Sequence, residues 1–352
     1  MTLPQLRYGS VCSGVEAATL AWHDLGWQPQ FFSEIEPFCC RLLQHRFPSV
    51  PNLGDLTKFK EWSDDIKLDL LVGGTPCQAF SVAGLRQGLA DPRGNLALVF
   101  LGLLDKYRPC WVVWENVPGV LSSSGGRDFG AFLGALAELG YGFCYRVLNA
   151  QYFGVPQRRR RVFVVGYRGD WRRAAAVLFE QASMCRDSAP SYSDREETTD
   201  SITPSPIGTD EKVIVRTMSL RGREGGATAE LGGTTATALR ASQDGGDKPY
   251  VLIETVSCYD DPRRYTSIHG GGEHGGLHPT LRSTNPAQLV TFSAGIRRLT
   301  PRECERLQGM PDDWTLIPDA KDSHRYKAIG NSMAVPVMRW IGEGIAAVEA
   351  LP

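Results

Sequence analysis

The stretch that most constrains the fold is a short apolar run that breaks into a glycine pair and then presents a cysteine. Residues 69–77 read Asp-Leu-Leu-Val-Gly-Gly-Thr-Pro-Cys. An apolar run of this length that ends in glycines is typical of a buried parallel strand leading into a loop at its carboxyl end. In open α/β sheets this end of the strands holds the chemistry, so we expect an α/β fold with a functional loop here.

The cysteine of this loop, Cys77, is a candidate nucleophile. Pro76 fixes the backbone angle φ just before the thiol, and the two glycines allow a ligand to approach the backbone closely. A thiol held on such a loop suits nucleophilic catalysis. A free cysteine is also commonly a small buried residue without a chemical role, and the loop by itself does not separate the two interpretations.

A second buried strand ends in a carboxylate. Residues 108–119 read Arg-Pro-Cys-Trp-Val-Val-Trp-Glu-Asn-Val-Pro-Gly, with Glu115 just before the turn. Two neighbouring parallel strands would deliver Cys77 and Glu115 to the same edge of the sheet. The pair would then be a nucleophile with an acid beside it.

With Pro76-Cys77-Gln78 and Glu115-Asn116-Val117 in this order, the chain resembles the DNA (cytosine-5) methyltransferases of bacterial or phage type. The resemblance covers roughly the first half and the last fifth of the chain, and it rests on several motifs in the right sequence. It implies a doubly wound, mostly parallel α/β sheet of the Rossmann-like type that binds S-adenosylmethionine. It also implies a catalytic domain of residues 1–168 plus 297–352 and a target-recognition domain of residues 169–296.

The amino-terminal segments carry the implied cofactor site. Residues 7–18 predict a strand, a turn of small residues and a helix, and such a turn lets a cofactor lie against backbone amides. Residues 30–36 predict a second strand that ends in acid, and Asp55 follows a short third strand. The cofactor residues that the resemblance implies are Cys12, Ser13, Gly14, Val15, Glu34, Ile35, Asp55, Leu56, Pro76, Asn331 and Ser332.

Within this set the resemblance gives Glu34 the ribose hydroxyls and Asp55 the adenine amine, whereas Glu36 fits a helix-starting acid. Two positions depart from the family pattern. Cys12 stands where many members have phenylalanine, and Glu16-Ala17 replaces a common glycine pair. The loss of the aromatic ring at position 12 places one stacking contact to the adenine in question, but not the site itself.

Four consecutive arginines, residues 158–161, precede another apolar run. Taken alone, such a cluster is commonly a solvated corner. The family's Gln-x-Arg-x-Arg pattern falls on Gln157, Arg159 and Arg161. Strand alternation then predicts that Arg159 and Arg161 point inward together, toward the base and its phosphates, and that residues 158 and 160 face outward.

Three further segments carry expectations. Residues 84–95 are rich in glycine and suit a lid over a bound nucleotide, with Arg93 as a phosphate contact. Residues 183–212 predict a linker, and beyond it Arg221, Arg240 and Arg282 each follow a small residue and a leucine, which suits readout of guanine. Three histidines at positions 269, 274 and 278 lie in a glycine loop without a completing cysteine, so we expect no metal site.

The carboxyl-terminal part returns to regular patterns. Thr300, Pro301 and Glu303 form a helix start signal, and Gly309 ends that helix. By the resemblance this segment braces the recognition domain. Asn331 and Ser332 return to close the cofactor pocket before a last amphipathic helix.

Composition bounds the class of protein. The 352 residues suit one or two domains, and no apolar run is long enough for a membrane span or a signal peptide. We therefore expect a cytoplasmic protein, monomeric by default. Nine cysteines, an odd number without a Cys-x-x-Cys pair, predict reduced thiols. The net charge of −1 gives no general support for a nucleic-acid partner, although arginines cluster locally.

The expected activity is methyl transfer from S-adenosylmethionine to carbon 5 of a cytosine that is flipped out of duplex DNA. Carbon 5 is a poor nucleophile, so Cys77 would add to carbon 6 while Glu115 protonates or hydrogen-bonds ring nitrogen 3. A cognate restriction endonuclease that acts separately is an open partner. The alternatives are tRNA cytosine-5 methylation, a catalytically silent DNA-binding protein and a nucleotide-dependent oxidoreductase, the last disfavoured by the poor glycine fingerprint.

Overall fold

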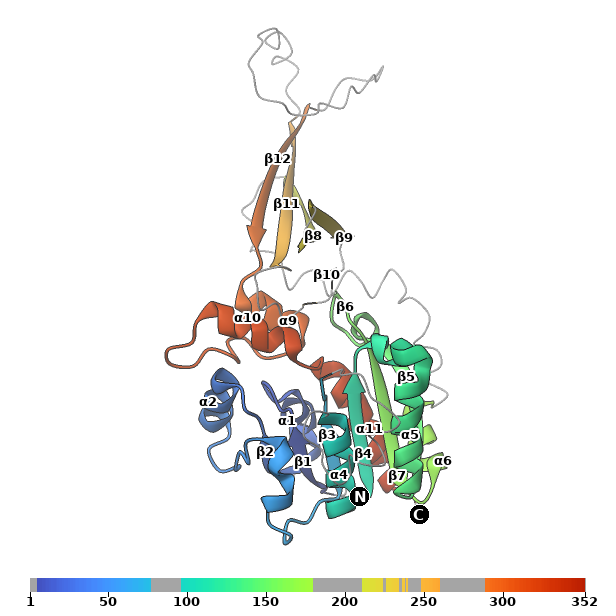
Figure 1. The fold of residues 1–352 in the computed structure, drawn as a ribbon. Coiled ribbons are helices and arrows are strands. Elements are labelled where there is room, and N and C mark those ends of the chain that lie inside the picture. The colour runs from blue at the N-terminus through green and yellow to red at the C-terminus, as the bar shows by residue number, and fades with distance from the viewer. Residues whose placement is uncertain are drawn as a thin grey trace.

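The computed structural model describes residues 5–76, 96–179, 211–223, 226–233, 236–237, 239, 248–259 and 289–351. Its main body is a six-stranded sheet of order β2-β1-β3-β4-β7-β5 (Figure 1). The strands are β1 Arg7–Val11, β2 Gln28–Ser33, β3 Leu70–Gly73, β4 Trp111–Asn116, β5 Tyr141–Asn149 and β7 Arg160–Arg168. Strands β2, β1, β3 and β4 pair in parallel, and β7 runs antiparallel to both of its neighbours. The predicted doubly wound, mostly parallel sheet is confirmed.

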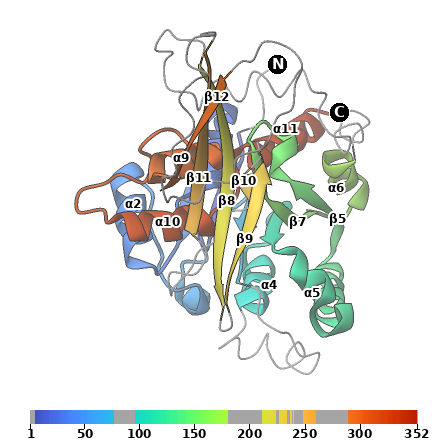
Figure 2. The ribbon, with the colours of Figure 1, turned by 90° about the horizontal axis from the view of Figure 1, so that it is seen from above.

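Helices cover both faces of this sheet. Figure 2 shows α4 and α5 on the opposite side of the sheet from α6 and α11. The α-helices of the described residues are α1 Ala17–Trp22, α2 Pro37–Arg46, α4 Leu96–Tyr107, α5 Arg127–Glu138, α6 Trp171–Leu178, α9 Pro301–Leu307, α10 Asp322–Asn331 and α11 Val335–Glu349. Short 3₁₀ segments are η1 His23–Leu25, η2 Leu56–Glu61, η3 Pro118–Gly126 and η4 Ala150–Tyr152.

The central strands are apolar because both of their faces are covered. Every residue of β3 and β4 is buried. Their side chains alternate between two hydrophobic cores: Trp111 and Val113 belong to the core under α1, α6 and α11, and Val112 and Trp114 to the core under α4 and α5. The continuous apolar runs that predicted buried parallel strands are explained by this double coverage.

The predicted third strand before Asp55 is not a strand in the structure. Asn52 makes only a single bridge to Phe32. The Asn52 side-chain oxygen accepts the N–H groups of Glu34 and Gly54, so local side-chain bonds replace a strand ladder. Asp55 instead caps η2.

A second sheet lies at the carboxyl ends of the main parallel strands and projects away from the body (Figure 1). It is antiparallel, with the order β12-β11-β8-β9. Its strands are β8 Glu211–Arg223, β9 Gly226–Gly233, β11 Lys248–Tyr259 and β12 Leu289–Arg298. A short parallel pair, β10 Ala236–Thr237 with β6 Gln157–Arg158, joins this part of the chain to the main body.

The packing bears on the domain boundaries expected from sequence. Helix α6 lies within the range assigned to the recognition domain, yet Ala174, Val177 and Leu178 belong to the same core as α1 and α11. A Cβ on Gly344 of α11 would lie 3.1 Å from Val177, so the two helices approach closely. The division into two domains stays a prediction, with α6 packed on the main sheet. Among the described residues, no helix is both long and apolar enough to cross a membrane.

Candidate active site

A cavity of about 400 Å³ opens at the carboxyl ends of the parallel strands. This volume is within the range of small-molecule sites. Most of the residues expected from sequence line it, namely Cys12, Ser13, Gly14, Glu34, Ile35, Asp55, Leu56, Pro76, Glu115, Arg159, Arg161, Asn331 and Ser332. Val15 does not line the cavity, because its side chain is buried in the main core.

The loop after β1 forms one wall and is held in an unusual conformation. Cys12, Gly14 and Glu16 have φ values of 51°, 56° and 62°, all in the left-handed region. The Ser13 hydroxyl donates to the Ser10 carbonyl at 2.9 Å, and the Gly14 N–H donates to Glu34 Oε2 at 2.7 Å. The loop is therefore tied to the acid at the end of β2.

Glu34 accepts three backbone N–H groups, from Gly14, Ile35 and Glu36. The Ile35 side chain is 68% exposed although it lines the cavity, so it offers an apolar surface to a flat ring. Glu36 caps α2 by accepting the N–H groups of Phe38 and Cys39, which confirms its interpretation as a helix-starting acid.

Asp55 adds a second carboxylate to this half of the cavity. Its Oδ1 accepts the Thr57 N–H at 2.9 Å and the Thr57 hydroxyl at 2.8 Å, which fixes the orientation of the carboxylate. Glu34, Asp55 and the exposed Ile35 together suit a nucleoside that carries a positive charge. The residues present thus fit S-adenosylmethionine, whose sulfonium centre is cationic.

Glu16 was not expected to have a role, since in the sequence it is only a departure from a glycine pair. It is 1% exposed, accepts from Ser10 and Thr19, and lies beneath the cofactor loop. Burial raises the pKa of Glu16 to about 7, against the lowering effect of these hydrogen bonds.

We expect the Glu16→Gln variant to gain stability relative to the natural chain as the pH rises. Between pH 4.5 and about 7 the folded state holds a proton on Glu16 that the unfolded chain has lost. The free energy of unfolding of the natural chain therefore falls by about 3 kcal/mol across this window, whereas that of the variant does not, because glutamine does not ionise. Urea unfolding of both proteins near pH 5 and pH 8 measures this difference, and a pH-independent difference would contradict it.

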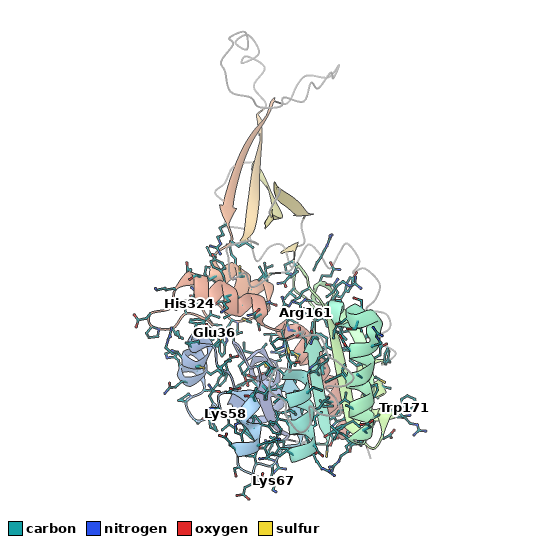
Figure 3. The ribbon with its side chains drawn as sticks, in the orientation of Figure 1. Glu36, Lys58, Lys67, Arg161, Trp171 and His324 are labelled. Carbon is teal, nitrogen blue, oxygen red and sulfur yellow. The ribbon has the colours of Figure 1, made fainter. Side chains whose placement is uncertain are left out.

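Glu115 occupies the other half of the cavity. It is 8% exposed, and its Oε1 lies 3.1 Å from Nε of Arg161. Burial raises the pKa of Glu115, and the charges of Arg159 and Arg161 oppose this rise. Figure 3 shows Arg161 at the end of the main sheet that faces α9.

The glycine pair after β3 leaves room for this carboxyl group. Strands β3 and β4 pair in parallel, with Gly73 opposite Trp114, so the adjacency expected from sequence is confirmed. A Cβ on Gly74 would lie 3.0 Å from Glu115 Oε2. Asn116 Nδ2 donates to the Thr75 carbonyl at 3.0 Å and anchors the loop that leads through Pro76 into Cys77.

Arg159 and Arg161 both point inward while Arg158 and Arg160 are exposed, as the alternation predicts. Their partners differ, however. Arg159 is 2% exposed, and its guanidinium donates to three backbone carbonyls, those of Leu239 at 3.0 Å, Gly330 at 3.2 Å and Ser332 at 2.5 Å. Burial is the main cause that lowers the pKa of Arg159 to about 9, followed by the charge of Arg161.

Arg159 thus ties its own segment to two distant parts of the chain. Leu239 belongs to the inserted segment, Gly330 lies in α10 and Ser332 follows it in the cavity wall. Sequence reasoning directed Arg159 toward the base, and it missed this arrangement because no local pattern specifies a bond to a carbonyl 80 to 173 residues away. Arg161, paired with Glu115, is the arginine that faces the acid.

Several predicted features lie outside the described residues: Cys77, the lid with Arg93, most of the linker, Arg240, Arg282 and the three histidines. Within the described part of the chain, no group of three or more histidine, cysteine, aspartate or glutamate side chains is arranged to hold a metal ion.

A doubly wound sheet with a cavity at its carboxyl edge whose residues fit S-adenosylmethionine points to the class of S-adenosylmethionine-dependent methyltransferases. A family model described as C-5 cytosine-specific DNA methylase matches residues 6–347, so the chain belongs to this family.

The relatives and solved structures that resemble this chain carry methyltransferase names of different kinds. The chain is 31% identical to the type II methyltransferase M.SsoII of Shigella sonnei, over 90% of this chain and 73% of that protein. It is 35% identical to a protein of Escherichia phage P1 named DNA N-6-adenine-methyltransferase, over 97% of this chain, and it spans 61% of that relative's length. The Dnmt2 methyltransferase of S. pombe shares the fold, with a TM-score of 0.55 at 13% identity over 99% of this chain and 100% of that one.

Proposed function

We propose that this protein transfers a methyl group to carbon 5 of a cytosine in a specific duplex DNA sequence, with Cys77 as the nucleophile and Glu115 as the acid. One observation carries the proposal. A buried carboxyl group with a raised pKa lies at the end of β4, against the loop that leads into Cys77 and in the same cavity as the residues suited to the cofactor.

S-adenosylmethionine supplies an activated methyl group on its sulfonium centre. The residues of the chain prepare the cytosine to accept it. The Cys77 thiolate adds to carbon 6, and the protonated Glu115 gives its proton to ring nitrogen 3, so the electron pair of the carbon 5–carbon 6 bond becomes available at carbon 5. After methylation, loss of the carbon 5 proton to a base expels the thiolate, and ring nitrogen 3 returns its proton to the Glu115 carboxylate, which restores the neutral aromatic ring and the starting state of the acid.

Glu115 and Arg161 have complementary parts in this scheme. Burial favours the protonated carboxyl group that a proton donor needs. Arg161 holds the carboxyl group in place through its Nε, and it stabilises the carboxylate that remains after proton transfer.

Methylation of adenine is the alternative that the name of the phage P1 relative raises. An exocyclic amine carries its own lone pair and needs no thiol addition. The Pro76-Cys77-Gln78 sequence, together with a buried Glu115 in the cavity, therefore favours cytosine. Cytosine in tRNA would use the same chemistry and differs only in the nucleic acid bound.

The test is trapping of a covalent complex on 5-fluorocytosine. The full chain is incubated with S-adenosylmethionine and a random-sequence duplex DNA pool that carries this base, from which the fluorine cannot leave as a cation. We expect a protein–DNA adduct that mass spectrometry maps to Cys77. The same pool with ordinary cytosine is the control and should give methylcytosine without a lasting adduct.

Three results would overturn the proposal. They are the absence of an adduct in a protein that binds S-adenosylmethionine, an adduct only with a 5-fluorocytosine RNA pool, and methyl incorporation found on adenine after base analysis.

A further inference from the structure

We propose that Trp314 is a positioning residue for the cofactor loop and that it links this loop to the α9–α10 segment, which is joined directly to the second sheet. The proposal rests on the assignment of the cavity to S-adenosylmethionine. It begins from one hydrogen bond: the indole N–H of Trp314 donates to the Val15 carbonyl at 2.9 Å, between residues 299 positions apart.

The Val15 carbonyl belongs to the loop that forms the cofactor wall. Cys12 and Gly14, in the left-handed backbone region, line the cavity immediately before it. A loop in such conformations keeps its shape only where neighbouring groups hold it. The Trp314 N–H provides a hydrogen bond to this loop from the carboxyl-terminal part of the chain.

Trp314 is itself held by the end of α2. The Arg46 guanidinium donates to the Trp314 carbonyl at 2.8 and 3.0 Å and to the Asp313 carbonyl at 2.8 Å. Its central carbon also lies 4.9 Å from the centre of the Trp314 ring. Helix α2 starts at the acidic residues 34–36 of the cavity wall. The contacts of Arg46 therefore join Trp314 to a second wall of the cavity.

The residue after Trp314, Thr315, is bound to α9 and α10 through a buried network of charged side chains. Thr315 and Glu305 are fully buried, and Arg325 of α10 donates to both, at 2.9 Å to the Thr315 hydroxyl and 3.1 Å to Glu305 Oε1. The Thr315 N–H also donates to Glu305 at 2.8 Å. Truncating a member of such a network leaves a buried group unpaired, so these contacts hold the segment around Trp314 against both helices.

Helices α9 and α10 lie between the second sheet and the main body (Figure 1). Strand β12 ends at Arg298, and α9 begins at Pro301. The Tyr326 hydroxyl of α10 donates to the Leu299 carbonyl, and the Arg298 guanidinium lies 3.7 Å from the centre of the Tyr326 ring. The contacts therefore run without interruption from β12 through α9–α10 and Trp314 to the cofactor loop. Figure 3 shows that α10 also lies above the start of α2, with His324 of α10 above Glu36.

The test is the Trp314→Phe variant of the full chain, which keeps an aromatic ring but loses the N–H donor. Without this hydrogen bond the loop is less ordered before binding, so part of the binding free energy of the cofactor is used to order it. We expect the Kd for S-adenosylmethionine, measured by calorimetry without DNA, and its KM to rise about three- to ten-fold. At saturating cofactor, kcat should stay within about two-fold, because no reacting group has moved.

The matched control is Trp340→Phe, since Trp340 is also half-buried and packs against Phe153 outside the cavity. Its Kd and KM should equal those of the natural chain. A second variant, Arg46→Gln, removes the Arg46 contacts with the Trp314 ring and carbonyl but keeps the indole N–H donor, and it should raise the same Kd. Because both changes act through one contact, the double variant should lose less than the product of the two single effects.

The inference is overturned if Trp314→Phe folds normally and binds S-adenosylmethionine as the natural chain does, or if kcat falls while KM does not change. If Trp314→Phe does not fold, an unchanged Kd in Arg46→Gln overturns it. A natural chain that binds no S-adenosylmethionine would instead contradict the proposed function.

Discussion

In the Cys77→Ser variant, methyl transfer is expected to fall below detection while S-adenosylmethionine and DNA still bind. A serine hydroxyl is far less acidic than a thiol, and its oxygen is a much weaker nucleophile toward an aromatic carbon, so the addition to carbon 6 fails. Binding should persist because, apart from Pro76, the cofactor residues of the described cavity are contributed by other segments. Transfer of a labelled methyl group, calorimetry and a gel-shift assay measure the three quantities.

The control for this variant is Cys110→Ser. Cys110 is exposed, and it precedes β4 at the opposite end of that strand from Glu115, so its loss should leave methyl transfer unchanged. Retained turnover in Cys77→Ser would contradict the covalent route.

Replacement of Glu115 by glutamine has the second-largest expected effect. We expect kcat to fall by about 10² to 10⁴, because the amide can still donate a hydrogen bond to ring nitrogen 3 but cannot transfer a proton. The amide oxygen can also accept from Arg161, so the local contacts at 3.1 Å are retained in the variant. A single-turnover assay at saturating cofactor measures the chemical step.

The pH profile separates a proton donor from a residue that only shapes the site. Transfer should rise with pH as the Cys77 thiolate forms and fall again as Glu115 ionises, at a pH above that of a free carboxyl group because burial raises the pKa of Glu115. Glu115→Gln should lose the decline at high pH and keep the rise. Matching profiles for the two proteins, or activity in the variant close to that of the natural chain, would contradict the role of Glu115.

Features that depend on local pattern could be predicted from the sequence. The apolar runs before Gly73 and Glu115 predicted two buried neighbouring strands, and the structure pairs them in parallel. The period of two placed Arg159 and Arg161 on the same side of the chain. The Thr300 and Glu303 signal forms a complete capping box, since its bonds lie within one helical turn.

Features that depend on distant contacts could not be predicted in this way. The carbonyls that bind Arg159 and the carbonyl that binds Trp314 come from segments far away in the chain, and a backbone oxygen has no sequence signature. The raised pKa of Glu16 follows from burial, which a lone glutamate among small residues does not reveal. The packing of α6 on the main core likewise could not be predicted, because it depends on contacts with α11, which lies far away in the chain.

The uneven charge of the cavity has a consequence for turnover. Glu34 and Asp55 line one half, and Arg159 and Arg161 line the other. These carboxylates attract a cofactor whose sulfur is positively charged, but after methyl transfer that sulfur is a neutral thioether. If this cavity holds S-adenosylmethionine as proposed, we expect these walls to hold the spent molecule less strongly than the cofactor, so that the reaction itself would weaken product inhibition and help the site to refill.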